Sequence, residues 1–244
     1  MEHLLLGHET ELTLHEVGEM LSHQATKHPV APWIPVSPST PMTDVIALLT
    51  KVRRVPVVDP ATQKVSKVIS QSLVSNQIHE ALSKLPEIPK RFLQTPREAG
   101  IGFKAVVTVT EETPAREAFQ TLIEKNVSAV GVMDEEGGLL TCITAKDIRL
   151  LPLVDKDDAT AEDDHTIQEL LDLPAVEFVS KARLVSEKKG KARPAVVVVN
   201  ADTPVHQMIA KLAKTGMHRL FLVDADHKPV GVFSVADAVK LLIE

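Results

Sequence analysis

The chain has 244 residues, of which 44% are hydrophobic and 25% charged, a composition that is typical of a globular protein and excludes general disorder. Its net charge of −6 argues against nucleic-acid binding as the main function, because phosphate contacts require clustered Lys and Arg. The single cysteine, Cys142, excludes an internal disulfide and a multi-thiolate metal site.

Residues 1–34 are expected to form an N-terminal helical segment. The first residues lack the basic flank of a signal peptide, and no apolar run in the chain approaches the ~20 residues of a membrane span. We therefore expect a soluble protein of the cytoplasm, the nucleus or both. The segment contains five histidines whose spacing matches no compact ligand pattern, so no metal site is expected. These histidines are His3, His8, His15, His23 and His28.

Three segments of the chain share one series of landmarks, which indicates an internal repeat. In the second and third copies, an aspartate follows a proline after 20 positions and another aspartate follows after 13 more. These landmarks are Pro114, Asp134 and Asp147 in residues 106–153, and Pro204, Asp224 and Asp237 in residues 194–244. A first, looser copy in residues 35–82 places Asp59 18 positions after Pro41 and Leu73 14 positions further on.

Each copy predicts the order β-α-β-β-α, and hence an α/β (α+β) fold of tandem repeats. A Thr-Pro pair opens the first helix, with proline at the first helical position and threonine as its cap. The predicted caps are Thr40, Thr113 and Thr203. The predicted core positions of these helices are Val45, Leu48, Leu49, Ala118, Leu122, Ile123, Met208, Ile209 and Leu212. Two apolar strands then form a hairpin, in residues 129–143 of the second copy and 220–233 of the third.

A unit of about 45–50 residues buries its open sheet face poorly alone, so we expect the copies to pack in pairs. Two linkers of different character separate the copies. Residues 83–105 are punctuated by prolines and predict a short helix at Pro89–Leu93. Residues 154–193 begin acidic and end basic, and are interpreted as solvated loops with one packed helix within Thr166–Val179.

The repeats resemble the cystathionine-β-synthase (CBS) domain family, and in particular the gamma subunits of AMP-activated protein kinase. The resemblance covers roughly residues 10–244 and is sharpest in four stretches. These are VRRVPVVDP from Val52, NVSAVGVMDEEG from Asn126, MHRLFLVD from Met217 and VGVFSVADAVKLL from Val230. The three copies are similar to the second, third and fourth repeats of that subunit, and its first repeat has no counterpart.

The resemblance implies that repeats pair into Bateman modules and hold adenine nucleotides (AMP, ADP or ATP) in the clefts between them. Asp147 and Asp237 occupy the position of the carboxylate that holds the ribose, since an ionised carboxylate can accept hydrogen bonds from both ribose hydroxyls. Thr144 and Ser234 would support these two carboxylates. The side chains that would meet phosphate are Arg53, Arg54, His218 and Arg219.

The first two copies depart from a complete site. In the first copy Leu73 stands where the ribose carboxylate would be, a departure that the gamma subunit shares in its second repeat. Ser72 and Arg53 replace a lysine and a histidine that the family commonly has. The second copy has Ser128 and Ala129 in place of the basic pair, so another repeat would have to meet its phosphate.

Structural alternatives exist for each candidate residue. Thr144 with Asp147 and Ser234 with Asp237 also match a helix-capping pattern that needs no ligand. Arg53, Arg54 and Arg219 could form surface salt bridges, and His218 could be a partly buried structural histidine. Cys142 lies in an apolar strand and is expected to act as a small hydrophobe.

We expect no enzymatic activity, since the chain contains neither a nucleophile motif nor a glycine-rich phosphate loop. The leading hypothesis is a regulatory subunit that senses adenine nucleotides and modulates a Ser/Thr protein kinase complex by binding its catalytic and scaffold subunits. The alternative is a CBS-repeat interaction scaffold with no nucleotide bound, possible as a homodimer because the first copy lacks an evident mate. Residues 1–34, a second chain or a partner could cover its pairing face, and the chain could also be a fragment.

Overall fold

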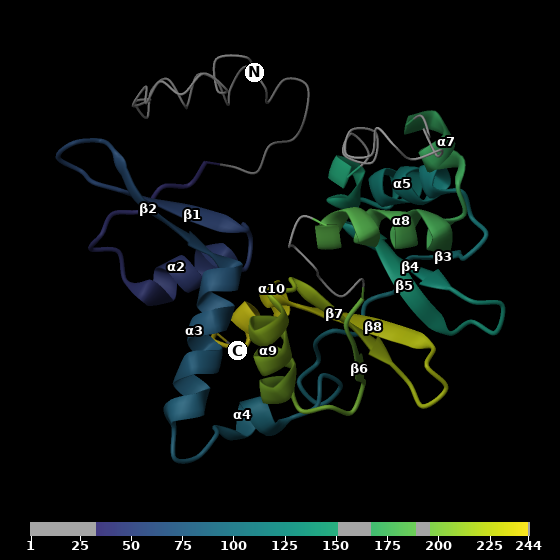
Figure 1. Ribbon diagram of the computed structural model, residues 1–244. Helices are drawn as coiled ribbons and strands as arrows, with labels where there is room; N and C mark the ends of the chain where they lie inside the picture. The colour runs from purple at the N-terminus through teal and green to yellow at the C-terminus, as the bar shows by residue number, and fades with distance from the viewer. Residues whose placement is uncertain (1–32, 151–166, 189–195, 244) are drawn as a thin grey trace. The chain divides into compact units, whose positions relative to one another are not determined.

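The computed structural model describes residues 33–150, 167–188 and 196–243, which divide into two compact units (Figure 1). Of the described residues, 33–77 and 238–243 form one unit, and those between 78 and 237 form the other. Of the expected helical segment 1–34, all but the last two residues lie outside the described part. Among the described helices, none combines the length and apolar character needed to cross a bilayer.

The first unit is built on one hairpin. Its elements are α2 (Met42–Leu49), β1 (Arg54–Val58), β2 (Val65–Ser70) and the first half of α3 (Gln71–Lys84). β1 and β2 pair antiparallel, while the strand expected before α2 is reduced to one parallel bridge between Val36 and Val57. Val45 and Leu49 of α2 are buried, as predicted, and Val55 of β1 is also fully buried.

The second unit contains two sheets of the same topology, one from each of the remaining copies. The first comprises β3 (Thr108–Thr110), β4 (Ala129–Met133) and β5 (Leu139–Thr144), and the second comprises β6 (Val198–Asn200), β7 (Arg219–Val223) and β8 (Pro229–Ser234). In each sheet the first strand runs parallel to the second, which pairs antiparallel with the third. Both predicted hairpins and the mixed α/β fold are therefore confirmed.

Helices α5 (Ala115–Glu124) and α9 (Val205–Thr215) connect the parallel strands. They bury the predicted apolar faces through Ala118, Leu122, Met208, Ile209 and Leu212. The prediction that Ile123 faces the core is wrong, because its side chain is 80% exposed. Phe119, four residues earlier and at the position equivalent to Ile209, is buried instead, so the buried stripe of α5 consists of Ala115, Ala118, Phe119 and Leu122.

The caps predicted at Thr40, Thr113 and Thr203 are wrong. The N-cap positions are Pro41, Pro114 and Pro204, and these three helices have no side-chain cap. Thr113 Oγ1 instead accepts a hydrogen bond from the backbone N–H of Thr110 at 3.1 Å, and Thr40 Oγ1 accepts one from Ser37 at 3.1 Å. These two hydroxyls close the turns before α2 and α5, since short polar side chains bond readily to nearby backbone.

The linkers contribute helices to the second unit. α4 (Lys90–Leu93) forms where the short helix was predicted, whereas the single helix predicted within 166–179 is in fact two, α7 (Ile167–Asp172) and α8 (Ala175–Lys188). α8 packs on α5 through Phe178 and Phe119, whose rings meet edge to face at 5.5 Å between centroids. It also contacts β5 and η2 (Asp147–Leu150), the single 3-10 turn that follows β5. α8 thereby covers the sheet of the second copy.

The second and third copies pair within this unit, as expected. Arg219 donates a hydrogen bond through Nη2 to Ser128 Oγ at 2.6 Å, and the backbone N–H of Leu139 donates to the carbonyl of His227 at 3.2 Å. The side chain of Phe221 lies close to Gly131, so the two middle strands also approach each other. The pairing thus joins both ends of the two hairpins.

Cys142 provides a test of this packing. It lies in β5 with 3% of its surface exposed, and burial raises the pKa of its thiol to about 12. Because the thiolate is the reactive form, we expect Cys142 in the native protein to react with a disulfide reagent at pH 8 on the order of 100-fold more slowly than in denaturant. The control is complete modification of the unfolded chain, and equally rapid modification of the native protein would contradict the buried position.

Candidate functional site

Asp237 lies at the junction of β8 and α10 (Val235–Lys240) and is 2% exposed. Its Oδ2 accepts hydrogen bonds from the backbone N–H of Ser234 at 2.9 Å and from Ser234 Oγ at 2.6 Å. In return, the backbone N–H of Asp237 lies 3.4 Å from Ser234 Oγ. This reciprocal arrangement satisfies backbone donors at the start of a helix, which is the purpose of a capping box.

Asp147 holds the equivalent place in the second copy. Its Oδ2 accepts from the backbone N–H of Thr144 at 2.6 Å and from Thr144 Oγ1 at 2.8 Å. Burial raises the pKa of the Asp147 carboxyl above its usual range, although the bonds from Thr144 and the positive charges of Lys146 and Arg183 oppose the rise. The ionised form of Asp147 is therefore less stable in the folded protein than in water.

The capping alternative is thus confirmed for Ser234 and Asp237, and in the second copy the two bonds from Thr144 to Asp147 form half of the same box, with the same carboxylate oxygen used in each. It does not exclude a ligand, because an ionised carboxylate carries about four acceptor positions and the caps use only one oxygen. The role of Asp147 and Asp237 in holding ribose stays a prediction.

The register of the hairpins explains why basic and acidic side chains share one end of each sheet. Arg219, the first residue of β7, lies directly opposite Ser234, the last residue of β8. The backbone N–H of Val235 also donates to the carbonyl of His218 at 3.1 Å. The pair His218–Arg219 is therefore placed beside Ser234 and, one helical turn further, Asp237.

The second copy repeats this geometry with Ala129 opposite Thr144 and with the N–H of Ala145 donating to the carbonyl of Ser128. Because Arg219 bonds to the Ser128 hydroxyl, the third copy supplies the basic group that the second copy lacks. The half-buried Arg219 thus spans the two copies, and His218 is exposed.

Arg53 and Arg54 lie in the first unit, where Arg54 faces Ser70 across the hairpin and the N–H of Gln71 donates to the carbonyl of Arg53 at 3.2 Å. Both arginine side chains are exposed. They occupy the same place in their repeat as His218–Arg219 in the third copy. Their contact with phosphate stays a prediction.

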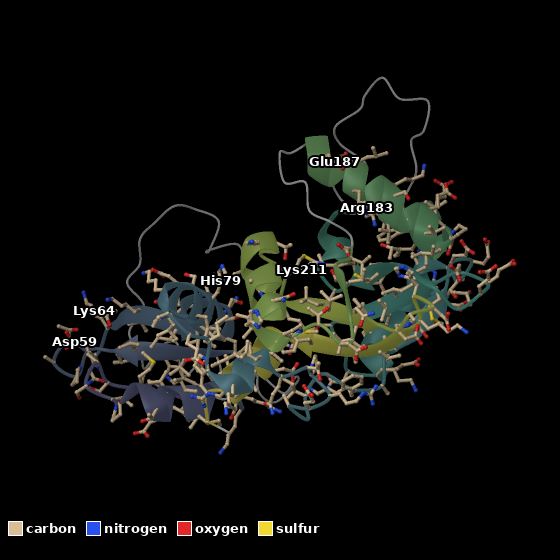
Figure 2. All side chains as sticks on the ribbon, turned by 90° about the horizontal axis from the view of Figure 1, so that it is seen from below. Asp59, Lys64, His79, Arg183, Glu187 and Lys211 are labelled. Atoms are coloured by element: carbon tan, nitrogen blue, oxygen red, sulfur yellow. The ribbon has the colours of Figure 1, made fainter. Side chains whose placement is uncertain are left out.

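The sequence patterns did not predict two basic residues that lie near the carboxylates. Lys104 Nζ lies 3.3 Å from Asp237 Oδ1, across 133 positions of the chain. Figure 2 labels Arg183 on α8. Its Nη2 donates to Thr141 Oγ1 at 2.9 Å, and Thr141 is only 4% exposed. No spacing or motif signals either contact, because each joins a linker residue to a residue far away in the chain.

The structure also contains a pocket of about 480 Å³ at the other end of the third sheet. It is lined by the ends of β6 and β7 and by α9, including Asn200, Lys211 and Asp224. Because β7 runs from Arg219 to Val223, this pocket lies one strand length away from Arg219, and none of the predicted site residues lines it. We give the end with Asp147 and Asp237 more weight, since it places carboxylates of two copies at the same strand ends as the basic Arg219.

Replacing Asp147 by Asn tests its environment. A pKa raised above the usual 3.8 means that folding favours the protonated carboxyl. The free energy of unfolding of the wild type, relative to Asp147→Asn, should therefore be greatest below pH 3.8 and decrease as the pH rises through the folded-state pKa. Denaturant titrations of both proteins across this range measure the difference, and a difference that instead grows with pH would show that ionised Asp147 is stabilised.

A model of the CBS domain family matches residues 17–76, 101–153 and 192–244, which is more than half of the chain. The 5'-AMP-activated protein kinase subunit gamma of Dictyostelium discoideum is 26% identical over 215 residues, covering 86% of this chain and 35% of that protein. Protein SDS23 of Candida albicans is 24% identical over 213 residues, covering 86% of this chain and 32% of that protein. The chain thus spans about a third of the length of these curated relatives.

A solved structure supports the fold. A protein from Methanocaldococcus jannaschii superimposes with a TM-score of 0.63 at 17% identity, over 94% of this chain and 76% of the other. The repeated β-α-β-β core, the paired copies and the three family matches lead to one conclusion: this chain belongs to the CBS domain family.

Proposed function

We propose that this chain is a non-catalytic regulatory subunit that binds an adenine nucleotide between its second and third repeats. The observation that carries the proposal is the placement of two equivalent carboxylates, Asp147 and Asp237, at the same ends of paired hairpins as the basic group of Arg219. A nucleotide needs this combination, because its ribose offers two hydroxyl donors and its phosphates carry negative charge.

In this proposal Asp147 and Asp237 accept hydrogen bonds from ribose hydroxyls through the oxygens that the caps leave available. Thr144 and Ser234 orient the two carboxylates by bonding to their other oxygens. Arg219, which already crosses between the repeats, exchanges its bond to Ser128 for a phosphate oxygen. His218 lies beside Arg219, and Arg53 and Arg54 would meet phosphate at the equivalent place of the first repeat. The number of basic groups that meet phosphate sets the preference among AMP, ADP and ATP.

The proposed partner is a Ser/Thr protein kinase complex in the cytoplasm or nucleus. The proposal draws on the relative named a kinase subunit gamma, which is 26% identical to this chain. A nucleotide regulates such a complex only through linkage, by binding its two regulatory states with different affinities. The chain would then contribute clefts whose affinity for the nucleotide differs between the two regulatory states of the complex.

One observation favours a second candidate, an interaction scaffold whose clefts hold no nucleotide. The polar groups of the site already have protein partners, since Asp147 bonds to Thr144, Asp237 to Ser234 and Lys104, and Arg219 to Ser128. A site whose groups are satisfied internally needs no ligand to be stable. A homodimer that covers the first repeat is one form of this scaffold.

Calorimetric titration of AMP, ADP and ATP into the wild type, Asp147→Asn and Asp237→Asn separates the two candidates. Asparagine keeps an acceptor for the cap but removes the charge that strengthens the bond to ribose. The regulatory proposal predicts micromolar binding to the wild type and a loss of about tenfold or more at the substituted site.

Asp134→Asn and Asp224→Asn are the matched controls. Their carboxylates also accept local backbone hydrogen bonds, but from the turn at the opposite end of each hairpin. Both controls should bind like the wild type. Failure of the folded wild type to bind any of the three nucleotides would favour the scaffold.

A further inference from the structure

The segment before the second repeat lies against the third repeat. The backbone N–H of Val232 in β8 donates to the carbonyl of Gly102 at 2.7 Å. Gly231 makes this approach possible, since a Cβ at that position would overlap the carbonyl oxygen of Gly102. β8 is an edge strand of its sheet, so the segment covers an edge that would otherwise be open.

This attachment brings Lys104 to Asp237. The Lys104 Nζ atom lies 3.3 Å from Asp237 Oδ1, while Ser234 occupies Oδ2. The Lys104 side chain is 65% exposed and that of Asp237 only 3%. The ammonium group therefore sits on the outer side of the carboxylate, at the oxygen that the cap leaves available.

We propose that Lys104 competes with the ribose of a nucleotide for Asp237 Oδ1, so that this ion pair sets the affinity of the third-repeat site. The inference rests on the proposed nucleotide site and adds an internal competitor to it. Asp147 differs, because Lys146 and Arg183 act on it through their charges while its hydrogen bonds come from Thr144. The two carboxylates thus meet a ribose under different conditions.

An ion pair with a largely exposed ammonium group is weak, so the competition is modest and reversible. Typical pairs of this kind correspond to a factor of roughly two to five in an equilibrium constant. The mostly exposed lysine can swing into solvent without disturbing the cap, because Ser234 holds the other oxygen of Asp237. Lys104 therefore tunes the site and does not block it.

The test uses Lys104→Met, which keeps the apolar stem and removes the charge, in an Asp147→Asn background that leaves only the third-repeat site. Adenosine is the first probe, because it has a ribose but no phosphate. We expect Lys104→Met to raise the affinity for adenosine roughly two- to fivefold. Lys125→Met, at the exposed end of α5, is the matched control and should leave the affinity unchanged.

Ionic strength gives a second, independent measurement of the competition. Added salt screens the ion pair but not an uncharged ligand, so it should raise the affinity of the Asp147→Asn protein for adenosine and have no such effect after Lys104→Met. Agreement between the two measurements excludes a general disturbance of the fold.

The other outcomes each overturn the inference in a recognisable way. Equal affinity for adenosine with and without Lys104 overturns the competition and leaves the nucleotide site intact. A loss of AMP affinity without a gain for adenosine makes Lys104 a phosphate ligand. If neither protein binds adenosine or AMP, the proposed function fails at this site, and the competition fails with it.

Discussion

The antiparallel register of the repeat hairpin is the constraint on which the rest of the site depends. Arg219, at the start of β7, pairs with Ser234, at the end of β8. Because α10 begins at the next residue, the start of β7 and the start of α10 are held side by side. The same pairing places Ala129 opposite Thr144 and Arg54 opposite Ser70. A shift by one residue would turn these side chains to the opposite face of the sheet, so the apolar pattern that fixes the register also fixes the polar end.

The two carboxylates show how one local motif acquires different chemistry from its surroundings. Both accept two hydrogen bonds from the residue three positions earlier, which is a purely local interaction. Around Asp147, burial dominates and raises the pKa of the carboxyl, whereas a lysine from a distant linker approaches Asp237. The repeated sequence therefore reproduces the hydrogen bonds of the two carboxylates, whereas the charges and the burial around each carboxylate depend on residues from other parts of the chain.

The predictability of the structure follows the same division between local and distant interactions. The spacing from Pro114 to Asp134 and Asp147 predicted the helix, the hairpin and the position of the carboxylate, since all three depend on residues close in sequence. Ile123 was misplaced because it lies at the margin of the apolar stripe near the end of α5, and the packing of Phe119 against Phe178 of α8, which is distant in sequence, shows where the buried face lies. Lys104 and Arg183 could not be predicted, because their partners lie in other parts of the chain.

The hydrogen bond between Gly102 and β8 also limits the order in which parts of the protein can fold during synthesis. Lys104 and Asp237 are separated by 133 positions, and the whole second repeat lies between them. During synthesis the second repeat can form its hairpin before the edge strand that receives Gly102 has emerged from the ribosome. Closing so long a loop is entropically costly and comes late. The third-repeat site is therefore assembled after the second repeat has been synthesised, and any interruption of synthesis before β8 leaves a chain without it.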